Sequence, residues 1–106
     1  MKLQDNDIGV KGAEVISQSL KQNKTLRGFK LAENDIQSEG AEFILKSNFS
    51  LEWIDIGKNK IGNRVGPTLQ YFIESSANLK KLNLEYNELQ LKGVEYITAG
   101  NLFLAI

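Results

Sequence analysis

The stretch Leu31-Ala32-Glu33-Asn34-Asp35-Ile36 carries the pattern that decides the fold of this chain. Reduced to L-x-x-N-x-L, with Ile allowed at the Leu positions, the motif occurs four times in 106 residues. Its copies begin at residues 3, 31, 56 and 84, so the spacings are 28, 25 and 28 residues. A period of this length is typical of stacked repeats, in which each unit buries its apolar face against its neighbours.

Apolar spacing changes from strand-like to helix-like across each copy. The pattern L-x-x-L-x-L, as in Leu26, Phe29 and Leu31, precedes the Asn, and the two-residue step from Phe29 to Leu31 places both side chains on one face of a short, half-buried strand. After the Asn the spacing becomes i, i+3, i+4, which predicts a helix. We therefore expect strands near 1–3, 28–31, 53–56 and 81–84, and helices over about 10–22, 38–47, 65–75 and 91–99.

A longer register is superimposed on the short one, because a shift of 53 residues maps one half of the chain onto the other. Asn34 then matches Asn87, and Ile44 matches Ile97. By this register the next copy would begin at residue 107, so the apolar residues in 102–106 form a tail with no strand to follow. Uncapped ends of a repeat stack expose core and strand edge, so we expect self-association. The alternative is a tail that folds back as an irregular cap.

These repeats resemble leucine-rich repeats of the ribonuclease-inhibitor-like class, over essentially the whole chain. Small-residue steps at Gly12-Ala13, Gly40-Ala41 and Gly93-Val94 fit that class, whereas Val65-Gly66 departs from it. The resemblance implies an α/β solenoid, a right-handed βα arc with parallel strands on the concave face and helices on the convex face. We expect a single domain over residues 1–106, with four repeats of approximately 3–30, 31–55, 56–83 and 84–106.

Elementary geometry leads to the same arc. Strands stack about 4.8 Å apart, whereas helices approach no closer than about 8–10 Å, so a stack of strand–helix units bends with its strands inside. At the strand exits, the repeated Asn can hydrogen-bond backbone groups of its own turn and of the next, which predicts a structural ladder. We expect seven residues to be almost fully buried: Leu31, Ile36, Ile44, Ile56, Leu69, Leu82 and Leu84.

The composition favours a chain without catalytic chemistry. It contains no His and no Cys, which removes the commonest general base, the thiol nucleophile, disulfides and Cys/His zinc sites. Thirteen basic residues balance thirteen acidic ones, which argues against a general binder of nucleic acid or anionic membranes. We therefore expect no enzyme activity, cofactor or metal. A polar N-terminus without an apolar run, together with the absence of Cys, favours a cytoplasmic location.

The concave face remains as the candidate functional surface. Its strand residues form a strip of mixed charge that holds one Trp and one Tyr, a composition that resembles a protein-binding hot spot. The alternative is that Trp53 only packs against its neighbours. The candidate protein-binding residues are Lys30, Trp53, Asp55, Lys81, Asn83, Glu85 and Tyr86.

The most favoured function is a non-catalytic module that binds a protein partner of unknown identity through this face. The alternative is a regulator of a small GTPase, similar to the Ran GTPase-activating protein, which has the same class of repeat. That alternative would require a loop that contacts the GTPase, and the sequence shows no inserted loop. Arg27 and Arg64, the two arginines, stand in no context typical of an arginine finger.

Overall fold

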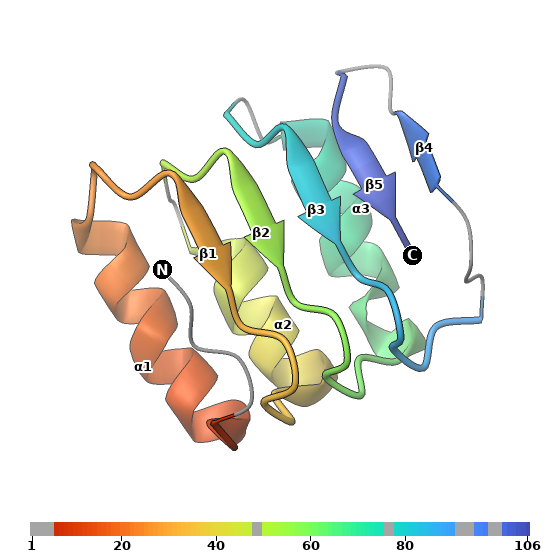
Figure 1. The fold of residues 1–106 in the computed structure, drawn as a ribbon, viewed down its shortest axis with the longest axis horizontal. Helices are drawn as coiled ribbons and strands as arrows, with labels where there is room; N and C mark the ends of the chain where they lie inside the picture. Colours follow the sequence, from red (N-terminus) through yellow and green to blue (C-terminus); the bar gives the residue numbers. More distant parts are fainter. Residues whose placement is uncertain (1–5, 48–49, 76–77, 91–94, 98–100) are drawn as a thin grey trace.

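The chain folds as two layers, a sheet on one side and helices on the other (Figure 1). The computed structural model describes residues 6–47, 50–75, 78–90, 95–97 and 101–106. Within these residues the helices are α1 (Gly9–Gln22), α2 (Gln37–Lys46) and α3 (Gly66–Ser75), and a 3₁₀ turn, η1 (Asn63–Val65), leads into α3. The strands are β1 (Gly28–Lys30), β2 (Trp53–Asp55), β3 (Lys81–Asn83), β4 (Glu95–Ile97) and β5 (Phe103–Ala105).

The sheet follows the order β1-β2-β3-β5-β4, with the first four strands of that order parallel. Phe29, Ile54, Leu82 and Leu104 lie side by side across it and are at most 1% exposed, so this face carries the core. The sheet face that points away from the helices is called the concave face below. The leucine-rich-repeat solenoid and the strands expected at 28–31, 53–56 and 81–84 are confirmed, while the expected strand at 1–3 lies outside the described residues.

The first three expected helices are confirmed with shifts of a residue or two. The 25-residue repeat has a helix of 10 residues, α2, where the first repeat has the 14 residues of α1. Pro67 lies in the first turn of α3, where its missing N–H needs no partner. No helix in the described part of the chain is long and apolar enough to cross a membrane.

The predicted core is confirmed except at one position. Six of its seven residues are 0% exposed, whereas Leu69 on α3 is only half-buried against the core. Among the described residues α3 is the last helix, and its one helical neighbour is α2, so the other side of α3 is not covered by a helix.

The helix expected over 91–99 is wrong in its described part, because residues 95–97 form strand β4, antiparallel to β5. The expected tail is wrong as well, since Phe103–Ala105 join the sheet as β5, parallel to β3. Leu104 lies in register with Leu82 only 22 residues later, whereas 28 residues separate Leu82 from Ile54. Because β4 runs antiparallel to β5, the chain reaches the position beside β3 with fewer residues than a helical repeat uses, and the apolar tail joins the core. Leu102, Leu104 and Ile106 are at most 7% exposed, so these three residues do not form an open apolar end, and the self-association expected from uncapped ends stays a prediction.

Candidate functional site

A ladder of buried Asn side chains fixes the turns at the ends of the strands. Asn59 Oδ1 accepts hydrogen bonds from the backbone N–H groups of Asn34 (2.9 Å) and Ile36 (3.2 Å) in the preceding repeat. Its Nδ2 donates to the carbonyl oxygens of Leu31 and Gly57, both at 2.9 Å. Asn34 and Asn87 make corresponding bonds along the stack. The predicted ladder is therefore confirmed, and it holds neighbouring repeats in one register.

The residues beside each Asn take the left-handed conformation that these turns require. Glu33, Lys58 and Tyr86 precede the Asn with φ of 61°, 53° and 60°, so their side chains fall into a column. Lys58 Nζ lies 3.8 Å from Glu33 Oε1 and 5.5 Å from the centre of the Tyr86 ring. These contacts are exposed and contribute little stability, but they shape the edge of the sheet where the strands end, here called the turn rim.

The sheet register builds the concave face from aligned rows. Equivalent positions of successive repeats lie as direct neighbours across β1, β2 and β3. β5 extends these rows, which the sequence did not predict. One row is Gly28, Trp53, Lys81 and Phe103, and the next is Lys30, Asp55, Asn83 and Ala105.

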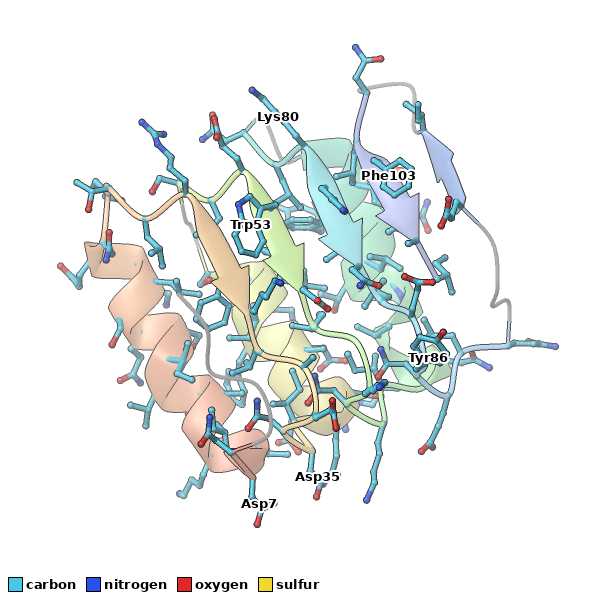
Figure 2. All side chains as sticks on the ribbon, viewed as in Figure 1. Asp7, Asp35, Trp53, Lys80, Tyr86 and Phe103 are labelled. Atoms are coloured by element: carbon cyan, nitrogen blue, oxygen red, sulfur yellow. The ribbon has the colours of Figure 1, made fainter. Side chains whose placement is uncertain are left out.

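Trp53 leans across the neighbouring strand rather than standing free. A Cβ atom built on Gly28 would overlap its indole ring, so the ring lies directly over the bare backbone of β1. Trp53 is half-buried in this position on the concave face (Figure 2). It therefore packs against its neighbour and still offers surface to solvent, which combines the two alternatives that the sequence left open.

Next to Trp53 the concave face is hollowed, over a volume of about 490 Å³. The hollow holds five of the seven candidate residues, whereas Glu85 and Tyr86 lie apart on the turn rim, with Tyr86 75% exposed. The candidate site is thus two neighbouring patches rather than one. The hollow is lined by Lys30, Glu52, Trp53, Ile54, Asp55, Lys80, Lys81 and Asn83.

Two of the candidate residues also support the strand exits. Asp55 Oδ1 accepts the N–H of Gly57 at 3.0 Å, and Asn83 Oδ1 accepts the N–H of Glu85 at 2.8 Å. These bonds hold the side chains in place at the end of each strand. Each bond uses one side-chain oxygen as the acceptor.

Sequence reasoning missed three residues of this surface. Phe103 lies at the end of the first row, with Lys81 Nζ 5.8 Å from the centre of its ring. Glu52 and Lys80 stand just before β2 and β3 and form an ion pair of 3.7 Å. Glu52 and Lys80 each come directly before a residue of the concave face. A two-residue alternation therefore assigns them to the opposite, core-facing side, and the sequence pattern did not predict them on this surface.

Little in the described residues suggests chemistry beyond binding. No group of three or more His, Cys, Asp or Glu residues in the described part is arranged to hold a metal ion. Arg64, in η1, pairs with Glu42 of α2 at 3.3 Å, on the helical side of the molecule rather than on the concave face.

Comparison with known proteins agrees with this architecture. A family model described as Leucine Rich repeat matches residues 2–17, 22–45 and 75–97. The chain is similar to RAN GTPase-activating protein 2 of Arabidopsis thaliana, with 26% identity over 99 residues. That alignment covers 90% of this chain but 18% of the relative, so the chain spans less than a fifth of that protein's length.

Proposed function

Because the chain belongs to the leucine-rich repeat family, whose members generally act as protein-interaction modules, we propose that it binds a protein partner through its concave face. The observation that carries the proposal is Trp53, half-buried over Gly28 at the edge of the hollow. An aromatic side chain held by its own fold and ringed by charged groups is typical of the residues that dominate binding energy. We further propose the ribonuclease-inhibitor-like subtype and a cytoplasmic location.

The shape of the hollow favours a protein over a small molecule. Its floor is a single sheet layer, formed by side chains of β1, β2 and β3. Small-molecule sites bury about 70–90% of their ligand, which a one-sided hollow does not achieve. A protein partner instead covers a face of about 800 Å² and reaches both the hollow and the turn rim.

The test is retention of partners by the immobilised chain, with Trp53→Ala as the probe. Proteins held by the wild type from an extract are quantified by mass spectrometry. We expect Trp53→Ala to weaken the specific partner about thirtyfold or more, as removal of an anchoring Trp does, with little loss of folding. Lys11→Ala, on the exposed face of α1, is the matched control and should bind as the wild type. Equal losses from both variants would place the interface elsewhere.

The second candidate function is regulation of a small GTPase, favoured by the similarity to RAN GTPase-activating protein 2. Arg27 is exposed one residue before β1, whereas Arg64 pairs with Glu42 on the helical side, so Arg27 is the arginine to test first. The test measures GTP hydrolysis by Ran with and without the chain. If the chain accelerates hydrolysis and Arg27→Ala abolishes the acceleration, this function is established. If the rate of hydrolysis is unchanged, this function is rejected and the protein-interaction module remains the proposed function.

A further inference from the structure

The charges around Trp53 differ in sign from those around Tyr86. Arg27 and Lys30 lie on the β1 side of Trp53, and Lys80 and Lys81 lie on the β3 side. The backbone N–H of Trp53 donates to the backbone carbonyl oxygen of Arg27 at 3.2 Å, so the residue that precedes β1 lies beside the start of β2. Lys30, Lys80 and Lys81 line the same hollow as Trp53, and Arg27 stands one residue before Gly28, the register partner of Trp53.

Each of the two carboxylates that line the hollow has a contact within the fold. Glu52 pairs with Lys80, and Asp55 accepts the backbone N–H of Gly57. Arg27 and Lys30 form no ion pair with any described residue. The hollow is lined by three Lys and two carboxylates, and Arg27 stands just before β1, so this region has an excess of positive charge in a chain whose formal net charge is zero.

The turn rim shows the opposite sign. Glu85 and Glu88 stand beside Tyr86 in the sequence, and Lys58, whose Nζ lies 5.5 Å from the centre of the Tyr86 ring, is paired with Glu33. Trp53 and Lys80 lie toward the beginnings of the strands, whereas Tyr86 lies toward their ends (Figure 2). Trp53 and Tyr86 therefore stand among charges of different sign, and the charge on the concave face changes along its strands.

We propose, building on the concave-face function, that the partner contacts Trp53 with an acidic peptide segment. In this segment an apolar side chain packs on the open face of the indole. Its flanking carboxylates meet Arg27 and Lys30 on one side and Lys81 on the other. These three cations lack a carboxylate partner among the described residues, and Lys81 instead lies over the Phe103 ring. Charge complementarity of this kind sets orientation and association rate more than affinity.

A peptide fits the patch better than a nucleic acid does. Glu52 and Asp55 remain inside the ring of cations and would repel a continuous line of phosphates. A peptide can place its carboxylates only where the cations stand and can leave neutral groups opposite the acids.

The experiment selects ligands on the full chain from a displayed library of random short peptides. We expect binders enriched, relative to the input library, in Asp and Glu next to an apolar residue. One enriched peptide is then synthesised without Trp and titrated, with the emission of Trp53 as the readout, because the chain has one Trp. The triple variant Arg27→Gln, Lys30→Gln, Lys81→Gln should weaken this binding about tenfold or more, since several partly screened ion pairs are lost together.

The matched control removes the same charge, one Arg and two Lys, from exposed positions away from the beginnings of the strands: Lys11→Gln, Lys60→Gln and Arg64→Gln. It should leave the affinity unchanged, and an equal loss there would overturn the proposal. Selection of neutral or basic peptides that still require Trp53 would overturn the acidic partner but keep the concave-face function. Binders that ignore Trp53→Ala would overturn both. A single-stranded oligo-dT that binds as tightly as the peptide would also overturn the peptide assignment.

Discussion

Asn59 shows at the scale of one residue why the repeated Asn is needed. Its buried amide satisfies two N–H groups and two carbonyl groups that water cannot reach. Asn59→Ala leaves these groups unpaired, and we expect the free energy of unfolding to fall by ~3 kcal/mol. Urea denaturation measures the loss. Asn78→Ala, at an exposed bend, should change stability by less than ~0.5 kcal/mol, and a similar cost for both variants would contradict a structural ladder.

Gly28 controls where Trp53 lies. A methyl group at position 28 would overlap the indole, so Gly28→Ala should push the ring off β1 toward water. We expect the fluorescence emission of this Trp to shift to the red and partner binding to weaken, with the fold kept. Gly66→Ala is the control, because a Cβ there meets open space. An unchanged emission spectrum in Gly28→Ala would show that the ring does not rest on β1.

Individual positions could be predicted from the sequence where the repeat period governs them. The period placed Asn34 and Asn59 on a ladder, and it placed Gly28 beside Trp53 across neighbouring strands. It could not show that the indole turns toward β1, because a side-chain rotamer depends on packing rather than on period. It also missed Lys80, which stands at the entry of a strand where the alternation has not yet begun.

Among the elements, the predictions from the sequence were wrong at β4 and β5. The match of Ile97 to the buried Ile44 predicted a fourth helix, yet Ile97 lies in a strand and is 67% exposed. The local pattern was overridden by the apolar tail, which gains burial by joining the sheet three residues earlier than the 53-residue register allows. The repeat register shows which residues occupy equivalent positions in the sequence. Which arrangement forms, a fourth helix or strand β5 beside β3, depends on how much apolar surface each one buries.

Two substitutions separate these pairings. Leu104 is 0% exposed in β5, so Leu104→Ala should lower the free energy of unfolding by ~2–4 kcal/mol through lost transfer energy and a cavity. Ile97→Ala should cost less than ~0.5 kcal/mol, since its side chain is largely in water. A regular fourth helix would instead make Ile97→Ala as costly as a core truncation. Chemical denaturation of both variants decides between the two arrangements.

At the scale of the whole molecule, the parallel arrangement of the repeats explains why the charge on the concave face changes sign along the strands. All three helices run the same way beside the sheet, so their N-termini gather near the turn rim (Figure 1). Acidic side chains are favoured near helix N-termini and basic ones near their C-termini. Lys21 and Lys46 stand in the last turns of α1 and α2, whereas Glu39 stands in the first turn of α2. A chain with no net charge is therefore charged oppositely at its two edges.

The same parallel stacking couples the repeats into one folding unit. The core is continuous from Ala13 in α1 to Ile106 after β5, and each buried Asn bonds into the preceding repeat. We expect urea unfolding to give one transition, with the same midpoint by far-ultraviolet circular dichroism and by Trp53 fluorescence. Asn59→Ala should move both curves together, because its bonds cross the middle of the stack. Separate midpoints in the wild type would contradict the single domain over 1–106. If the circular dichroism and fluorescence curves separate only in Asn59→Ala, each repeat is stabilised by its nearest neighbours alone.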